Sequence, residues 1–455
     1  MRKTMTRWHA KYGPILRLNL GSQQFISLES VPLAKELFGQ SGATFSSRPR
    51  MVMAGEVMTK GTQTATLPYG DKWKLHNRLQ LSVLNPRRVQ SYGKLLEAES
   101  QRLVYQLLSI TDTKDLEIAF NRITFNIIYT LAYDKNPEEN TSDFKESLGL
   151  AKEFTEALIN STWAVDLFPA LDYLPGFMKP WKRFGDDFHR RMLQFLGRNT
   201  AHAIKTRSWN WTQHIMKSEN TGDLTSTEIQ CLIGVLFEAG VDSTAIVLQY
   251  FVQACVLHPE AVRRAKQEIN DVVGRGRMPN EKDMSCLPYT KAFCSEVLRW
   301  RSTSLGFPHS TTREHIYKGY VIPKGSIILQ NIWTSHHDET IYREASSFRP
   351  ERFLENPDLP LATFGFGRRS CPGRHLAAAT LEAVIPKLLW AYNFHTSAEL
   401  DDYRDTLAGA YEEGGVLRPV DLPVEWKVYD ESTKTVMEES LRNTNIDTES
   451  ITSSL

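Results

Sequence analysis

A glycine-rich segment that ends in a cysteine constrains this chain more than any other feature does. The segment, Phe364–Gly373, reads FGFGRRSCPG, and a helical pattern begins directly after it. Gly365 and Gly367 let the backbone adopt conformations that other residues avoid, and they let it approach a flat ligand closely. Cys371 precedes the predicted helix, where free N–H groups and the positive end of the helix dipole favour a thiolate. Arg369 adds positive charge, so the segment is expected to present one anionic sulfur.

The same ten residues resemble the haem-binding loop of the cytochrome P-450 family, whose pattern is Phe-x-x-Gly-x-Arg-x-Cys-x-Gly. Phe364, Gly367, Arg369, Cys371 and Gly373 fill every fixed place of that pattern. The resemblance implies that the cysteine thiolate ligates the iron of haem b (iron protoporphyrin IX) and that the other four residues bind the cofactor. A buried structural cysteine in a glycine turn is the alternative, and other motifs in the chain can decide between the two.

A second motif lies in the longest apolar stretch of the chain. Ala239–Thr244 reads AGVDST and resembles the family pattern Ala-Gly-x-(Asp or Glu)-Thr-Thr, on the dioxygen side of the haem. A glycine within a helix costs about 1 kcal/mol relative to alanine, so Gly240 is expected to open the helix locally for dioxygen and a water. The resemblance implies that Asp242 and Ser243, with Thr244 behind them, relay protons to dioxygen at the iron. Ser243 stands where the family more often has threonine, so we expect looser proton delivery.

A third signature joins two distant segments. Glu296 and Arg299 form Glu-x-x-Arg at i,i+3 spacing, and Arg352 lies in a downstream Pro-Glu-Arg-Phe. Such a pair alone is common on solvated helices. The resemblance implies a buried network in which both guanidinium groups bond one carboxylate. We interpret this network as a scaffold for the haem loop.

Further cofactor contacts follow from the resemblance. Trp73 fills the first place of the family's Trp-x-x-x-Arg, whose side chains reach the haem propionates, but Asn77 occupies the arginine place and Arg78 follows it. A shift of one residue turns a helical side chain by about 100°, so a solvated helix face is the alternative for Arg78. His309 matches a place where the family has Arg or His against a propionate, and an ordinary surface or core histidine is its alternative.

The resemblance also locates the substrate pocket and its entrance. Ala239, Gly240, Leu305 and Phe307 are the expected wall residues. The proline-broken apolar link 166–177 corresponds to the family segment between two helices that cap the entrance and touch the membrane. An ordinary packed loop is the alternative for this link.

Composition bounds the remaining possibilities. A net charge of +1 gives no field that would attract nucleic acid. The five cysteines form no Cys-x-x-Cys, which argues against a disulfide framework or a zinc site and favours a reducing compartment. The apolar stretch 229–257 contains Glu238 and Asp242. Each carboxylate would cost about 2.5–3.5 kcal/mol at the centre of a bilayer, so we predict a buried core helix rather than a membrane span.

The resemblance covers about residues 10–429. It implies a cytochrome P-450 fold, mainly α with small β-sheets, as a single haem domain over residues 1–429. The first residues resemble the point where the catalytic domain begins in membrane-anchored members, so we expect the anchor to be missing from this chain. Residues 430–455 are acidic and rich in Ser and Thr, and we predict that they form a flexible tail.

By the resemblance, the chain is a haem-thiolate monooxygenase similar to fungal microsomal members. It would insert one atom of dioxygen into a lipophilic substrate, by hydroxylation or epoxidation. No flavin, nicotinamide or Walker motif is present. Electrons are therefore expected from NADPH through a separate cytochrome P-450 reductase, with cytochrome b5 as an additional donor, at the cytosolic face of the endoplasmic reticulum. Lys72, Lys74, Arg368 and Arg374 are the expected basic docking surface, with a solvated surface as the alternative.

Two other functions are compatible with the cysteine loop alone. A haem-thiolate isomerase or dehydratase rearranges peroxides without dioxygen, but such a reaction needs no proton relay, so the pair Asp242–Ser243 argues against it. A non-catalytic haem binder or sensor is disfavoured by the same motif. Dependence of turnover on dioxygen and reductase separates these functions from a monooxygenase.

Overall fold

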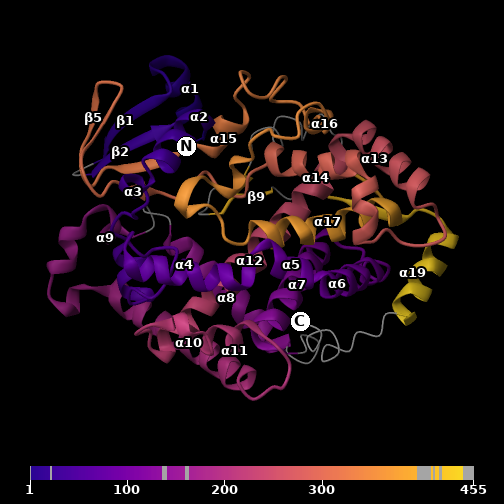
Figure 1. Cartoon of the computed structure of the whole chain (residues 1–455), viewed down its shortest axis with the longest axis horizontal. Helices are drawn as coiled ribbons and strands as arrows, with labels where there is room; N and C mark the ends of the chain where they lie inside the picture. The colour runs from indigo at the N-terminus through magenta and orange to yellow at the C-terminus, as the bar shows by residue number, and fades with distance from the viewer. Residues whose placement is uncertain are drawn as a thin grey trace.

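The computed structural model of the chain describes residues 2–20, 23–135, 141–158, 163–396, 411–412, 416–419 and 423–443. Helices dominate these residues, and the β-strands form only small sheets, as the sequence predicted (Figure 1). The sheet that contains β1 and β2 lies at one side of the molecule, and helices make up the rest (Figure 1).

The longest helix, α12 (Ser226–Leu257), runs through the helical core. It begins at a capping box: Glu228 N–H donates to the Thr225 hydroxyl, and Thr225 N–H donates to the Glu228 carboxylate. It ends at His258, before Pro259. Among the described residues, only α12 has the length and apolarity to cross a membrane, but most of its apolar window is buried inside the protein. It is therefore the core helix that the sequence predicted.

The helices that pack most extensively on α12 are α7 (Thr113–Tyr133), α10 (Pro180–Ala203), α14 (Pro288–Trp300) and α17 (Arg374–Ala391). The other α-helices are α1 (Arg2–Tyr12), α2 (Val31–Ala34), α3 (Gly42–Phe45), α4 (Asp71–Leu84), α5 (Pro86–Ser91), α6 (Gly93–Gln106), α8 (Thr141–Ala157), α9 (Ala164–Leu167), α11 (Trp211–Met216), α13 (Pro259–Val272), α15 (Ile332–His336), α16 (Glu351–Glu355) and α19 (Glu431–Asn443). The π-helical segments are η1 (Lys35–Gln40) and η2 (Val52–Met58), and the 3₁₀ turns are η4 (Pro169–Tyr173), η5 (Gly176–Met178), η6 (Glu219–Thr221), η7 (Glu281–Cys286), η8 (Ala362–Phe364) and η9 (Gly367–Arg369).

The main sheet has four strands in the order β1 (Ile15–Leu20), β2 (Gln23–Leu28), β6 (Ile327–Gln330) and β3 (His309–Ser310). β1 and β2 are antiparallel, with Ile15 opposite Leu28, whereas β2 and β6 are parallel. The described residues also form three two-stranded sheets: β4 (His315–Tyr317) with β5 (Tyr320–Ile322), β7 (Tyr392–His395) with β10 (Glu425–Val428), and β8 (Tyr411–Glu412) with β9 (Arg418–Pro419).

The cysteine-containing segment lies between two hydrophobic cores. The larger core is made by the helices, and the smaller one lies under the main sheet and includes Ile26, Phe38 and Ile328. Phe364 packs against the helical core, and Phe366 packs against the core under the sheet. The segment is therefore held from both sides where it leads into α17.

The predicted flexible tail is helical over its first part. Residues 431–443 form α19, which packs on α6, and residues 444–455 lie outside the described residues. The Asp430 carboxylate accepts the Thr433 N–H at 2.7 Å and so caps the helix, while Thr433 and Met437 are buried. The acidic, Ser/Thr-rich composition suggested disorder, but this capping and the burial of Met437 favour a docked helix.

Candidate functional site

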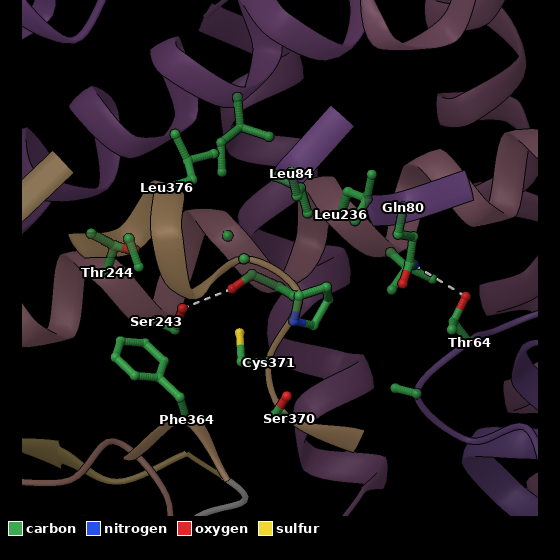
Figure 2. A pocket seen from close by; sticks show the side chains of 18 of the residues that line it. Thr64, Gln80, Leu84, Leu236, Ser243, Thr244, Phe364, Ser370, Cys371 and Leu376 are labelled. Atoms are coloured by element: carbon green, nitrogen blue, oxygen red, sulfur yellow. Dashed lines mark hydrogen bonds between the residues drawn. The ribbon is translucent and has the colours of Figure 1, made fainter. Parts of the chain in front are cut away.

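A cavity of about 310 Å³ lies among α4, α7, α12 and α17 and the cysteine-containing segment (Figure 2). Its wall is mainly apolar, with Leu84, Leu236 and Leu376 among its side chains. The predicted site residues on the wall are Trp73, Ala239, Gly240, Ser243, Thr244, Phe364, Arg369, Cys371 and Gly373. The cavity thus gathers predicted site residues from three distant parts of the sequence.

Two glycines shape the loop that presents Cys371. Cys371 N–H donates to Phe364 O over 2.8 Å and closes the loop. Gly365 and Gly367 have φ values of 67° and 68°, in the left-handed region that side chains disfavour. A Cβ on Gly367 would lie 1.9 Å from Phe38 O, so this glycine allows a close backbone approach and does not itself line the cavity. As a result, the Cys371 sulfur lies at the cavity, beside Phe364 (Figure 2).

Opposing effects set the ionisation of Cys371. Burial raises the pKa of its thiol, whereas hydrogen bonds from the N–H groups of Gly373 and Arg374 and the charge of Arg374 lower that pKa. The sequence analysis assigned the neighbouring charge to Arg369, and this is wrong because the Arg369 guanidinium bonds backbone carbonyls elsewhere. No group of three or more His, Cys, Asp or Glu side chains in the described ranges could hold a metal ion.

Two arginines without carboxylate partners line the same cavity. Arg48 and Arg369 both donate to backbone carbonyls, those of Ala65, Pro308, Ser46 and Leu67. Burial lowers the pKa of Arg369 to about 9, and burial together with the charge of Arg369 lowers the pKa of Arg48 well below its usual range. Within the part of the chain that the structure describes, neither guanidinium pairs with a carboxylate, so this region favours an anionic ligand.

These features fit haem b. The Cys371 sulfur is placed to hold the iron, and the unpaired guanidinium groups of Arg48 and Arg369 suit the propionates. Trp73 is buried at the same place, with the Arg369 guanidinium 4.3 Å from its ring centre. His309 is not on the cavity wall; its Nδ1–H donates to Phe45 O at 2.8 Å. Burial, followed by the charge of Arg48, lowers the pKa of His309 well below its usual range, so it stays a neutral neighbour of the arginines.

Arg78 does not take the place that the sequence analysis gave it. Its side chain is exposed and is absent from the cavity wall, whereas Trp73 and Asn77 line the cavity. The reason is helical geometry: α4 turns by about 100° per residue, so the residue after Asn77 points elsewhere. Arg48, from the loop before η2, lines the cavity instead, and no motif in the sequence analysis identified it.

The wall formed by α12 is a continuous helix. Gly240 does not open the helix. The glycine instead leaves room for the side chain of Ile128 on α7, because a Cβ at position 240 would lie 2.1 Å from Cδ1 of Ile128. The Ser243 hydroxyl donates to Ala239 O at 2.8 Å, a bond to the preceding turn. Ser243 and Thr244 both line the cavity (Figure 2). Ser243 is therefore a wall hydroxyl whose proton is held within the helix.

Asp242 lies behind this wall. It is buried, does not line the cavity, and accepts two hydrogen bonds of 2.8 Å from Arg418 of β9. Arg418 lies 2.8 Å from Asp242 and 3.9 Å from Glu117. The exposed fraction of the side chain is 12% for Asp242, 30% for Arg418 and 43% for Glu117. Asp242 thus faces a charged path to the surface, away from the hydroxyl of Ser243.

Glu296, Arg299 and Arg352 meet in the buried network that the family resemblance implied. Arg299 donates to both oxygens of the Glu296 carboxylate at 2.7 and 2.8 Å, and Arg352 lies 3.1 Å from one of them. Both arginines also donate to backbone carbonyls of residues 336–347. The network is outside the cavity and ties α14 to the segment that precedes the cysteine-containing loop.

The two predicted substrate residues of the segment before β3 are misplaced. Leu305 and Phe307 do not line the cavity, whereas Thr303 does. Gly306 has a φ of 120° and turns the chain between them. Phe307 consequently stacks on Arg48, whose guanidinium lies 4.2 Å from the ring centre. Ala239 and Gly240 line the cavity.

Comparisons with known proteins show the family and the fold of this chain. The family model "Cytochrome P-450" matches residues 1–415. The chain is similar to cytochrome P-450 monooxygenase astF of Aspergillus oryzae, with 49% identity over 99% of this chain and 86% of the relative. It is also similar to cytochrome P-450 monooxygenase aneD of Aspergillus aculeatus, with 42% identity over 86% of this chain and 77% of that protein. A zebra fish cytochrome P-450 solved with abiraterone has the same fold, with a TM-score of 0.76 at 22% identity over 94% of this chain and 100% of the other.

Proposed function

The chain belongs to the cytochrome P-450 family and is one of its monooxygenases; from this premise we propose that it inserts one oxygen atom of dioxygen into a lipophilic organic substrate, by hydroxylation or epoxidation. The observation that carries the proposal is the Cys371 sulfur at an apolar cavity that also holds two unpaired arginines. An apolar wall favours a substrate that is itself mainly apolar.

We propose that Cys371 ligates the haem iron and that Arg48, Arg369 and Trp73 bind the propionates, with His309 as a neutral neighbour. When bound, the haem supplies the reductive activation of dioxygen, which the thiolate ligand promotes. The chain itself contributes the N–H groups of Gly373 and Arg374, which bond the sulfur and stabilise its negative charge. Pairing the guanidinium groups with propionates also compensates two charges whose burial is otherwise unfavourable.

Proton delivery to the cavity is assigned to Ser243, with Thr244 beside it and Asp242 as the reserve acid. Ser243 Oγ–H is bonded to Ala239 O, and a rotation about χ1 directs it into the cavity instead. The carboxylate of Asp242 is paired with Arg418, which lies 3.9 Å from Glu117, so Asp242 stands on a charged path between the α12 wall and the surface. Because serine lacks the methyl group that restricts threonine, its hydroxyl changes rotamer easily, and we expect incomplete coupling of electron use to product formation.

We propose that NADPH–cytochrome P-450 reductase supplies the electrons, with cytochrome b5 as an additional donor. Of the four basic residues predicted to form the docking surface, Lys74 and Arg368 lie together on the Tyr69 ring, at 5.7 and 5.4 Å from its centre. Lys72 is paired with Glu228 and Lys74 with Asp71, and Arg374 donates to Cys371 O. A surface near the cysteine loop that carries two exposed cations supports steering of an acidic partner.

We propose that the protein acts at the cytosolic face of the endoplasmic reticulum and contacts the membrane through the link 166–177. Three aromatic side chains of this link are strongly exposed: Phe168 at 56%, Tyr173 at 86% and Phe177 at 80%. Neighbouring exposed aromatic side chains are unusual on a wholly solvated surface and suit the interfacial region of a bilayer.

The test is a reconstituted reaction of the haem-loaded protein with NADPH, reductase and a panel of lipophilic substrates. Substrates are first selected by the shift that they cause in the haem spin state. The proposal expects product with one added oxygen, formed only with reductase and dioxygen together. Product formed from a peroxide without dioxygen, and without added oxygen, would contradict it.

A further inference from the structure

Gln80 is a nearly buried amide on the cavity wall that the proposed reaction does not use. It belongs to α4 and shares one helix face with Trp73, Asn77 and Leu84, which also line the cavity. Only 2% of its surface is exposed. A rise of about 1.5 Å per residue places Gln80 about 10 Å along the helix from Trp73. It therefore lies toward the apolar end of this wall, at Leu84, rather than beside the Trp73 ring.

The nitrogen of the Gln80 amide is held by a buried chain of hydrogen bonds. Nε2 donates to the Thr64 hydroxyl oxygen at 3.2 Å (Figure 2). Thr64 lines the cavity, and its hydroxyl lies 2.9 Å from Nδ1 of the buried His76. Burial, followed by the charge of Lys72, lowers the pKa of His76 to about 4, so the ring is neutral at pH 7. Because a hydroxyl has two lone pairs, Thr64 accepts the Gln80 N–H with either tautomer of His76.

The oxygen of the same amide is free. Within the part of the chain that the structure describes, the Gln80 side chain forms one hydrogen bond, that of Nε2, so Oε1 accepts none. Oε1 keeps accessible surface although the side chain as a whole is almost completely buried at the cavity wall. Buried polar atoms nearly always have a partner. This carbonyl oxygen is therefore available to a group that occupies the cavity.

The chemistry of the wall defines which group suits Oε1. An amide oxygen accepts hydrogen bonds and donates none, so it selects a donor. Of the described residues that line the cavity, none is Asp or Glu, and Arg48 and Arg369 are cations. A ligand ammonium group would meet these two like charges and no carboxylate. A neutral donor, such as a hydroxyl or an amide N–H, gains the hydrogen bond without that repulsion.

We propose that Gln80, positioned by Thr64 and His76, is a specificity-determining residue whose Oε1 accepts a hydrogen bond from a neutral O–H or N–H group of a lipophilic substrate. The proposal rests on the proposed function, since it assigns a feature of the substrate of the same cavity. The remainder of the substrate would pack on the apolar wall that includes Leu84 and Leu236.

The test uses three cage compounds with one skeleton: adamantane has no polar group, 2-adamantanone adds an acceptor, and 2-adamantanol adds a donor as well. Dissociation constants are measured from the haem spin-state shift, with ligand-induced shifts in thermal unfolding as a second readout. Gln80→Met removes the amide and keeps the length of the side chain. Thr64→Val removes the hydroxyl that holds the amide, and Thr64→Ser keeps it. Gln253→Met is the matched control, because Gln253 is a buried helical glutamine that does not line this cavity.

We expect the preference for 2-adamantanol over 2-adamantanone to fall about five-fold in Gln80→Met, the factor for one hydrogen bond of about 1 kcal/mol. The affinity for adamantane and the haem content should not change. Thr64→Val should also reduce the preference, whereas Thr64→Ser and Gln253→Met should keep it. The Thr64 pair decides the question if Gln80→Met fails to fold.

An unchanged preference in Gln80→Met and Thr64→Val would overturn the proposal and leave only a water at Oε1. A wild-type preference for 2-adamantanone that Gln80→Met abolishes would overturn it as well, because the amide would then present its N–H to the cavity. The proposed function would survive either result as long as the reduced carbonyl spectrum remains that of a haem-thiolate.

Discussion

Replacing either glycine of the cysteine loop by alanine should separate backbone strain from steric contact. Gly365 and Gly367 have nearly equal φ values, 67° and 68°. A Cβ on Gly365 meets nothing within 4 Å, whereas one on Gly367 lies 1.9 Å from Phe38 O. Strained backbone alone costs about 1–3 kcal/mol, and forcing an atom into a packed site adds about 1–3 kcal/mol. We therefore expect losses of about 1–3 kcal/mol for Gly365→Ala and about 2–6 kcal/mol for Gly367→Ala.

The assay is the free energy of unfolding from urea titration, together with the haem content of each purified variant. Gly365→Ala should keep its haem and a thiolate-type carbonyl spectrum. Gly367→Ala should lose haem as well as stability, because a shift of the loop away from Phe38 would also move Cys371. Equal losses of stability with full haem content in both variants would refute the argument that the close approach of Gly367 positions the sulfur.

Three further predictions follow from individual side chains. Ser243→Ala should keep haem but release more peroxide per NADPH oxidised, and unaltered coupling would remove Ser243 from proton delivery. Arg48→Leu should lower haem affinity at least ten-fold, for the loss of about 1.5–3 kcal/mol from a charge-assisted bond, whereas the exposed Arg78→Leu should not; equal affinities in a haem-transfer assay would contradict the assignment of the propionate cation. Burial raises the pKa of Asp166 from 3.8 to about 6, so ionisation opposes folding and its contribution becomes more favourable as the pH falls from 7 to 4. Asp166→Asn should flatten that part of the pH dependence of the unfolding free energy, and parallel curves for the two proteins would count against the raised pKa.

Most of the site could be predicted from local motifs, because each motif determines the backbone and side-chain arrangement of a few neighbouring residues. The cysteine loop and the network of Glu296 with its two arginines occur where the sequence analysis expected contact. The loop depends on a turn closed by one hydrogen bond and the Glu296–Arg299 pair on i,i+3 spacing, whereas the place of Arg352 followed from the family resemblance. The long apolar stretch was also predicted correctly as a buried core helix, because its two carboxylates argued against a membrane span.

The errors concern contacts made through space. Arg48 is far from every motif in the sequence, and only the folded chain brings it to Arg369. The positive φ of Gly306 directs Phe307 toward Arg48 and away from the cavity. The periodicity of the sequence does not predict such a backbone turn. The segment 431–443 has the composition of a tail, but its helix is stabilised by burial against α6, a distant element.

The bond between the Cys371 sulfur and the haem iron is tested most directly by the absorption spectrum of the reduced protein with carbon monoxide. The wild-type protein should give the red-shifted carbonyl band of a haem-thiolate, and Cys371→Ala should lack it even where haem remains bound. The same band in Cys371→Ala, or its absence from the haem-loaded wild-type protein, would contradict the assigned ligand and with it the proposed reaction.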